Sequence, residues 1–197
     1  MMKKIIIACL VFMSAHAIAQ KTTYADSLKK FQKNYVETHE VVQEPDWKYF
    51  RFFPVNPAYR VWTKFEKIND TIGFIMKTSG KISKKYFRYG ILSFSIDNKP
   101  LHLTVYQSEQ LLQNDQYKNY LFIPFTDLTS GEQSYAGGKY IDILIDDIKE
   151  NKVLIDFNKA YNPYCAYATG YNCPIPPRAN DLPVAIKAGE MDFGKKH

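Results

Sequence analysis

From Trp47 onward, short apolar or alternating runs fill the chain, and turn-forming residues separate them. The clearest alternation spans 60–65, and the Asp97-Asn98 turn joins the runs 91–96 and 101–106 as a hairpin. The remaining predicted strands cover 48–53, 71–77, 85–89, 120–125, 139–145 and 152–155. This many short strands predict an all-β fold, mainly antiparallel, as a sandwich or a barrel.

An amphipathic helix is predicted ahead of the strands, within 22–42. Its apolar stripe, at helical spacing, consists of Tyr24, Leu28, Phe31 and Tyr35. Thr23 can cap the helix, with Asp26 as the reciprocal partner. We expect this helix to dock on the sheet, and a partner-binding helix is the alternative.

The first 19 residues have the features of an export signal. Two lysines precede an apolar run, and small residues at 17 and 19 fit a cleavage site before Gln20. We therefore expect a periplasmic or secreted protein with no transmembrane segment after cleavage. A lipid anchor at Cys9 is less favoured because little apolar sequence precedes it. The expected organisation is a signal peptide in 1–19, an N-terminal helix in 20–44 and a single β-rich domain in 45–197.

Charge and motifs exclude several classes of function. The net charge of +6 loses two units with the signal peptide and is then modest, and because export is expected, a nucleic-acid partner is not. The basic and aromatic run 81–88 is more typical of a solvated strand edge, with an anionic glycan or lipid as the alternative partner. The sequence has no phosphate loop, dinucleotide fingerprint, histidine metal pair or Gly-x-Ser-x-Gly elbow, so we expect no cofactor and no metal.

Regular periodicity stops after the strand at 152–155. The stretch 153–190 contains half of the ten prolines, four asparagines and many aromatic residues. Prolines interrupt a strand ladder, while the aromatic residues make disorder a poor fit. We therefore expect an ordered coil packed on the domain. A second irregular stretch, 124–140, is rich in turn formers and precedes the strand at 139–145.

These two stretches carry a family resemblance. The segments DFNKAYNPYCAYATGYNCPIPP and LFIPFTDLTSGEQSYAGGKYIDI, with AGE further on, resemble the bacterial family of domains of unknown function DUF1684. The resemblance extends from about residue 52 to about residue 190. It implies an exported or envelope-associated β-rich domain and supplies no catalytic residues. The family pattern commonly has arginine where Lys139 stands, which puts a bidentate anion grip there in doubt.

Cys165 and Cys173 are the two cysteines beyond the signal segment. A disulfide fits an exported protein with an even number of cysteines. Free buried thiols, metal ligation and a nucleophilic cysteine remain as alternatives. The last would need His39 or His102 close by.

We expect the two irregular stretches to meet at one end of the sheet and form a cleft. The alternative for 124–140 is a structured turn whose polar groups satisfy one another. In the cleft, a non-catalytic envelope module would bind an unidentified small-molecule or glycan-like ligand, or an envelope protein. The candidate ligand-binding residues are Asp127, Glu132, Tyr135, Lys139, Tyr140, Asn158, Tyr161, Asn162, Asn180 and Glu190. The alternative function is a hydrolase that uses a carboxylate or Cys165 in the same cleft.

Overall fold

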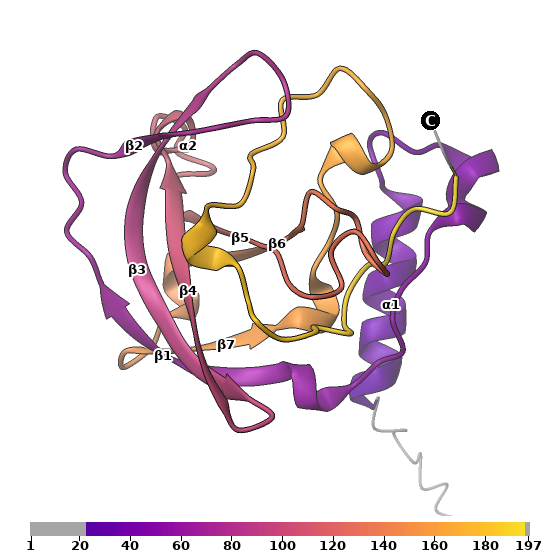
Figure 1. The fold of residues 1–197 in the computed structure, drawn as a ribbon, viewed down its shortest axis with the longest axis horizontal. Helices are drawn as coiled ribbons and strands as arrows, with labels where there is room; N and C mark the ends of the chain where they lie inside the picture. The colour runs from indigo at the N-terminus through magenta and orange to yellow at the C-terminus, as the bar shows by residue number, and fades with distance from the viewer. Residues whose placement is uncertain (1–22, 196–197) are drawn as a thin grey trace, which may run out of the picture.

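The computed structural model describes residues 23–195, and the predicted signal peptide lies outside them. Seven strands form a curled antiparallel sheet in the order β6-β5-β4-β3-β1-β7, and β2 pairs with β3 (Figure 1). The strands are β1 (Arg60–Lys67), β2 (Phe74–Met76), β3 (Lys84–Ile96), β4 (Lys99–Ser108), β5 (Tyr120–Phe125), β6 (Lys139–Leu144) and β7 (Lys152–Asp156). The predicted all-β, mainly antiparallel fold with an N-terminal helix is confirmed, and its form is a half-barrel.

The longest strand, β3, joins two of the predicted runs. The runs 85–89 and 91–96 are continuous because a bulge between Arg88 and Gly90 shifts the register without ending the strand. Gly90 sits against β1, where an added Cβ would lie 2.3 Å from the Phe65 ring. The sheet therefore bends where only a glycine lets the two strands approach.

The strand predicted at 48–53 was wrong. The 3₁₀ helix η1 (Glu44–Tyr49) occupies part of this run. Phe50, which follows η1, packs on aromatic residues from the C-terminal part of the chain, with its ring centroid 5.4 Å from that of Phe193 and 5.5 Å from that of Tyr167. The aromatic residues here serve tertiary packing, and packing with burial, rather than a backbone preference, is what β-propensity largely measures.

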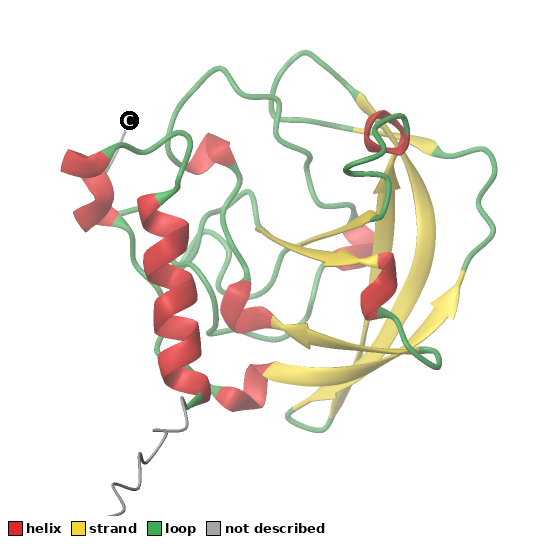
Figure 2. Cartoon of the chain, turned by 180° about the vertical axis from the view of Figure 1, so that it is seen from behind, coloured by secondary structure: helices red, strands yellow, loops and turns green. Residues whose placement is uncertain are grey.

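The helix α1 (Tyr24–Glu37) begins as predicted, with a capping box between Thr23 and Asp26. It ends before the predicted limit of 42 because Nδ1 of His39 accepts the backbone N–H groups of Val41 and Val42, which turns the chain. α1 stands at the open side of the curled sheet, opposite β3 and β4 (Figures 1 and 2). The other short helices are η2 (Pro57–Tyr59), α2 (Glu109–Leu112), η3 (Ile145–Asp147), η4 (Phe157–Lys159), η5 (Tyr164–Ala166) and η6 (Arg178–Asn180).

The core lies inside the curl, and the C-terminal tail fills its open side. Leu182, Val184, Ile186 and Ala188 are buried at alternate positions, as in a strand. The tail follows the turn after β5, where Leu182 N–H donates to the Thr126 carbonyl and Leu128 N–H donates to the Val184 carbonyl. The expected ordered coil therefore completes the core without a regular ladder.

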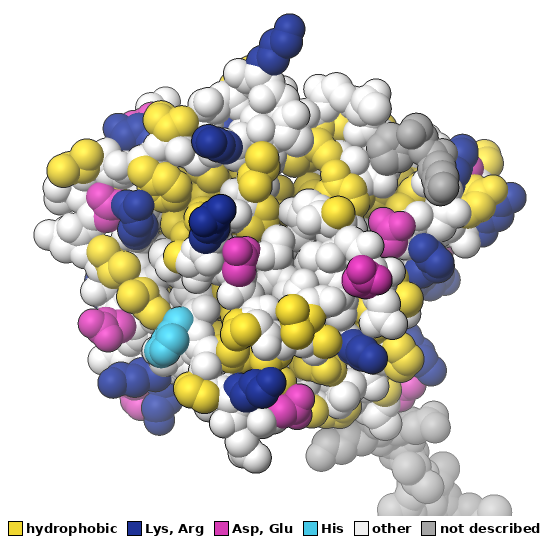
Figure 3. All heavy atoms as spheres, in the orientation of Figure 1, with side chains coloured by type: hydrophobic (Ala, Val, Ile, Leu, Met, Phe, Trp, Pro, Cys, Tyr) yellow, Lys and Arg dark blue, Asp and Glu magenta, His cyan; other side chains and the backbone are white. Residues whose placement is uncertain are grey.

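Charged side chains are mixed over the face seen in Figure 1. Figure 3 shows lysine, arginine, aspartate and glutamate side chains interspersed among apolar ones on that face. This face therefore carries no broad field of one sign. Within residues 23–195, no helix has the length and apolar character needed to cross a membrane.

Candidate functional site

Most of the polar residues proposed from the sequence are buried within the fold. The buried ones are Asp127, Lys139, Asn158, Asn162, Asn180 and Glu190. Asn180 shows their common role. Its side chain accepts the Thr104 N–H at 2.7 Å and donates to the carbonyls of Thr104, at 2.9 Å, and Pro124, at 2.7 Å. A side chain thus supplies the partners that a neighbouring strand would supply.

Lys139 and Asp127 form a buried ion pair, with 3.2 Å between Nζ and Oδ2. Lys139 also donates to the Ile186 carbonyl at 3.0 Å and the Ala188 carbonyl at 3.3 Å, while Asp127 accepts the Ile186 N–H at 3.1 Å. Burial lowers the pKa of Lys139, and the Asp127 carboxylate opposes that shift. The pair grips the tail and has no exposed surface from which to hold an anion.

Glu190 is the centre of a second buried network. It accepts the Asn162 N–H at 2.9 Å and hydroxyl groups from Tyr167, at 2.7 Å, and Tyr35, at 3.3 Å. Burial raises the pKa of Glu190 to about 7. The ring of His39 lies 4.6 Å from that of Tyr167, and burial lowers the pKa of His39 to about 4.

The amides of Asn158 and Asn162 hold neighbouring chain in the same way. Asn158 accepts the Asn56 N–H at 3.0 Å and donates to the Asn56 carbonyl at 2.9 Å. Asn162 donates to the Met191 carbonyl at 2.8 Å. These groups anchor loops to one another.

The turn at 124–138 meets the tail, as predicted. The two segments are in direct contact, however, where the sequence had suggested a cleft. Thr129 and Ser134 bond each other through their hydroxyl groups at 2.8 Å, and the Asp192 N–H donates to the Gln133 carbonyl at 3.0 Å. This matches the alternative of a turn whose polar groups satisfy one another. Of the remaining candidates in the turn, Glu132 is exposed and Tyr135 packs half-buried on the aromatic cluster around Phe50.

Cys165 and Cys173 form a disulfide, with 6.3 Å between their Cα atoms. A bonded sulfur is no nucleophile, so the oxidised protein has no thiol chemistry at Cys165. The disulfide ties together the coil 161–174, which crosses the outer face of the sheet. A cleft of about 610 Å³ lies between this coil and the outer face of the sheet. Tyr140, Tyr161 and Asn162 contribute to its lining.

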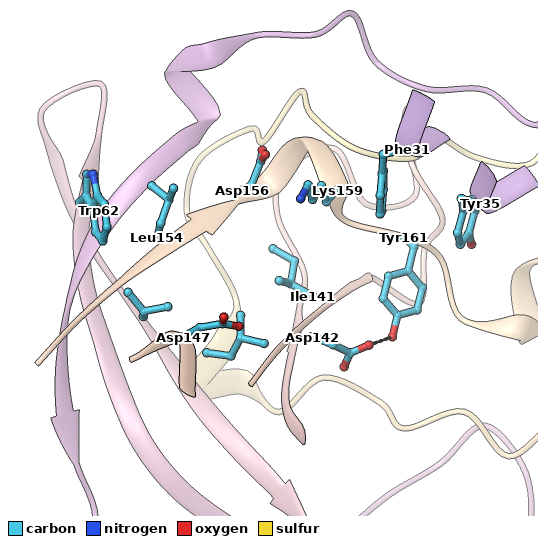
Figure 4. Close-up of a pocket in the computed structure, with 12 residues that line it drawn as sticks. Phe31, Tyr35, Trp62, Ile141, Asp142, Asp147, Leu154, Asp156, Lys159 and Tyr161 are labelled. Atoms are coloured by element: carbon cyan, nitrogen blue, oxygen red, sulfur yellow. Dashed lines mark hydrogen bonds between the residues drawn. The ribbon is translucent and has the colours of Figure 1, made fainter. Parts of the chain in front are cut away.

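A second cleft of about 610 Å³ opens at the seam of the half-barrel, and we call it the seam cleft (Figure 4). β6 and β7 follow each other in the chain, yet they stand at opposite ends of the strand order. At one end of the seam, η3 and the turn at 149–152 connect the two strands, and at the other the Tyr140–Tyr161 bridge joins β6 to the coil that follows η4. The lining residues are Phe31, Tyr35, Trp62, Ile141, Asp142, Ile143, Asp147, Val153, Leu154, Asp156, Lys159 and Tyr161.

Asp142 is the polar centre of the seam cleft. Its neighbours Ile141 and Ile143 point into the core, so strand alternation turns Asp142 outward into the cleft. Tyr161 donates its hydroxyl to Oδ2 of Asp142 at 2.5 Å, as the dashed line in Figure 4 shows. The surrounding chain desolvates the carboxyl and raises its pKa, although Tyr161 opposes that shift. Within residues 23–195, the other carboxylate oxygen receives no hydrogen bond, so it can accept one from a ligand.

Backbone groups also face the seam. Tyr140 exchanges both of its backbone hydrogen bonds with Tyr161, away from β5. Because these groups alternate along a strand, the N–H and C=O of Asp142 point the same way. Next along the edge, the Leu144 N–H is taken by the Asp147 carboxylate at 2.7 Å. The edge of β6 thus offers one backbone donor and one acceptor beside the carboxylate.

Aromatic side chains form the walls. Phe31 and Tyr35 come from α1, and Trp62, which is 68% exposed, stands on β1 at the other end (Figure 4). The Lys159 ammonium lies 5.3 Å from the centroid of the Phe31 ring. Asp156 accepts the Tyr24 hydroxyl at 2.9 Å, which fixes the first turn of α1 over the end of β7.

Sequence reasoning selected Tyr161 and missed the other residues of this cleft as a group. Trp62 carried a signal, because it is a large aromatic residue on the polar side of the alternating run 60–65. Asp142 looked like an ordinary outward residue of a half-buried strand. Residues 23–195 contain no group of three or more His, Cys, Asp or Glu side chains placed to hold a metal ion.

Comparison with known proteins identifies the family. The profile described as "Protein of unknown function (DUF1684)" matches residues 46–191. Among solved structures, the chain is similar to an uncharacterized protein from gene locus rrnAC0354 of Haloarcula marismortui, determined in solution by NMR. The two are 28% identical, the match covers 84% of this chain and 94% of that chain, and the TM-score is 0.62. No curated protein matches. The chain therefore belongs to the DUF1684 family of proteins of unknown function.

Proposed function

We propose that this protein is an exported, non-catalytic module that binds a small ligand in the seam cleft. The observation that carries the proposal is Asp142, whose carboxylate is held in place by Tyr161 at the centre of a cleft of about 610 Å³. Small-molecule sites typically enclose ~300–1,000 Å³ and combine apolar walls with a few fixed polar groups. The signal-like sequence of residues 1–19 supports export, and localisation in the periplasm or outside the cell goes with it.

The polar centre is preformed. Ile141 and Ile143 are buried on either side of Asp142, so the strand cannot rotate to withdraw the carboxylate. The hydrogen bond from Tyr161 fixes the side chain, and the backbone bridge to Tyr140 fixes Tyr161 in turn. A ligand that meets such a site does not have to pay for ordering it.

A hydrolase is the second candidate, and the raised pKa of Asp142 favours it because a general acid must hold its proton. Hydrolysis of a glycosidic bond, however, requires a second carboxylate paired with Asp142. Asp147 accepts the Leu144 N–H and Asp156 accepts the Tyr24 hydroxyl, so both are committed to the fold. Binding without reaction therefore fits the chemistry of the cleft better.

Ligand-observed NMR with mixtures of small metabolites and sugars would test the binding proposal. The test variant is Leu154→Arg, which fills the cleft from its β7 wall. The matched control is Ile75→Arg on β2, because Ile75 is 60% exposed and does not line the cleft. We expect compounds that bind the wild type and the control but lose binding to Leu154→Arg. If every binding compound binds all three proteins equally, the seam cleft is not the ligand site.

Two further measurements address export and catalysis. Expression of the full chain with N-terminal sequencing of the recovered protein should give a start at Gln20, and an intact N-terminus would contradict export by cleavage. Aryl glycosides and esters should not be turned over. If the wild type turns over one of these substrates and Asp142→Asn abolishes the turnover, the function is hydrolysis and not binding alone.

A further inference from the structure

We infer that the seam cleft binds a small organic cation, whose ammonium group sits at Asp142 between the aromatic walls. This inference rests on the proposed function and adds the chemical class of the ligand. Three features carry it: the local charge, the contacts that the aromatic walls already make, and the free carboxylate oxygen.

The local charge is opposite to that of the chain as a whole. The full sequence carries a net charge of +6. The residues within 23–195 that line the seam cleft, however, include Asp142, Asp147 and Asp156 and one cation, Lys159. A concave surface with low-dielectric walls focuses such a local charge, so cations concentrate there and anions are repelled.

The aromatic walls already attract the protein's own cations. The Lys159 ammonium lies 5.3 Å from the Phe31 ring centroid, and the Arg60 guanidinium lies 5.4 Å from the Tyr24 ring centroid near Asp156. Both distances are within the ~6 Å at which a ring face attracts a cation. Trp62, the residue type best suited to this contact, is 68% exposed and holds no cation of the protein within residues 23–195. A ligand cation can take that position.

The carboxylate completes the site. Tyr161 occupies Oδ2 of Asp142, which leaves Oδ1 to face the ligand. Tyr161 itself stays a neutral donor, because burial raises its pKa well above 10. The ligand therefore meets a negative charge in a fixed position within a cleft lined by aromatic side chains, the combination found in sites for quaternary ammonium groups. Its arrival also favours the ionised form of Asp142, which opposes the effect of desolvation.

An anionic or neutral sugar fits less well. An anion would be repelled by the aspartates that line the cleft, and Lys159, the one cation among the lining residues within 23–195, is already placed against Phe31. A neutral sugar would leave the charge of Asp142 without an opposite charge. Charge complementarity therefore selects the cation over both.

The test compares choline with 3,3-dimethyl-1-butanol, which has the same shape without the charge. The chain has two tryptophans, so Trp47→Phe leaves Trp62 as the single reporter in the cleft. We expect a saturable change in Trp62 fluorescence with choline and binding at least about tenfold weaker for the neutral analogue, about 1.4 kcal/mol. Isothermal titration with the wild-type chain checks both affinities without the reporter variant.

Two variants locate the charge. Asp142→Asn keeps the shape and should weaken choline binding about tenfold while leaving the neutral analogue unaffected. Asp146→Asn, an exposed neighbour outside the cleft lining, should leave both unchanged. Circular dichroism confirms that each variant is folded.

The outcomes separate the two proposals. If both compounds bind equally, or if Asp142→Asn leaves choline binding intact, the cation class is overturned while the cleft remains a binding site. If neither compound binds at millimolar concentration and the NMR screen finds uncharged ligands that Leu154→Arg excludes, the cation class again fails alone. If the screen also finds no ligand sensitive to Leu154→Arg, the proposed function fails with it.

Discussion

Glu190→Gln should remove a pH-dependent destabilisation of the fold. Glu190 is fully buried, and burial raises its pKa from 4.5 to about 7. The folded state therefore binds this proton more tightly than the unfolded chain does. The stability contributed by the proton is complete below pH 4.5 and is lost as the pH rises through 7. The two pKa values correspond to about 3 kcal/mol between these limits.

The groups around Glu190 determine what the variant keeps. Hydroxyl groups of Tyr167 and Tyr35 and the Asn162 N–H donate to the carboxyl, and the Lys139 ammonium acts on it through space. A glutamine retains a carbonyl acceptor for these donors, carries an amide NH₂ in place of the other oxygen, and does not titrate. Burial raises the pKa of both tyrosines further above neutrality, so they do not titrate in this window. When the free energies of unfolding of the wild type and the variant are subtracted at each pH, contributions common to both proteins, such as that of His39, cancel.

His39 works in the opposite direction. Burial lowers its pKa from 6.5 to about 4, with a smaller opposing effect from Glu40. The unfolded chain binds this proton more tightly, so stability is lost as the pH falls from 6.5 through 4. The rings packed around His39 belong to Tyr35, Phe50, Tyr164 and Tyr167. Because the two slopes oppose each other, wild-type stability should vary little between pH 4.5 and 6.5.

Urea unfolding at a series of pH values from 4.5 to 8, followed by tryptophan fluorescence, measures these slopes. The stability of Glu190→Gln should rise with pH as His39 loses its proton. The gain of the variant over the wild type should grow by about 3 kcal/mol across the range. Glu132→Gln, which changes an exposed carboxylate in the turn, should run parallel to the wild type. A Glu190→Gln curve parallel to the wild type would refute the raised pKa.

Three other substitutions test how the irregular chain is held. Cys165→Ser with Cys173→Ser should cost about 2–3 kcal/mol in urea unfolding, and a reductant should destabilise only the wild type. Lys139→Met should cost about 3–5 kcal/mol because Asp127 stays buried without its partner. Adding Asp127→Leu should recover part of that loss, and a double variant with no recovery would contradict the ion-pair argument. Asn180→Ala should cost about 2–4 kcal/mol in the same assay, because backbone groups of Thr104 and Pro124 lose their partners; a loss below ~1 kcal/mol would mean that water replaces the amide.

Local patterns predicted the fold better than the site, for a physical reason. Alternation and capping are short-range, so the strands and the start of α1 follow from their own sequence. The amides of the tail were also recognised as unusual. A sequence does not show, however, whether an amide such as Asn180 meets a ligand or a neighbouring backbone. That depends on strands β4 and β5, which lie more than 50 positions away in the chain.

Asp142, in contrast to the amides of the tail, was missed because nothing in its local sequence is unusual. The run from Tyr140 to Leu144 alternates as any half-buried strand does, and an acidic residue on its outer side is ordinary. The outer side becomes a cleft only because β6 and β7 end the sheet without pairing with each other, and because α1 stands beside them. Both conditions are set by topology, which local periodicity does not contain.

The buried polar residues and the seam cleft have one origin in the unclosed barrel. A closed barrel would pair β6 with β7 and leave no edge. Here the tail completes the core on side-chain hydrogen bonds from Asn180, Lys139 and Asp127, so the sheet does not need to close. The remaining edge is an aggregation hazard, which a charged side chain such as Asp142 reduces. Asp142 thus satisfies two constraints. An Asp142→Asn protein that stays monomeric but loses choline would assign the residue to binding, whereas one that self-associates would assign it to protection of the edge.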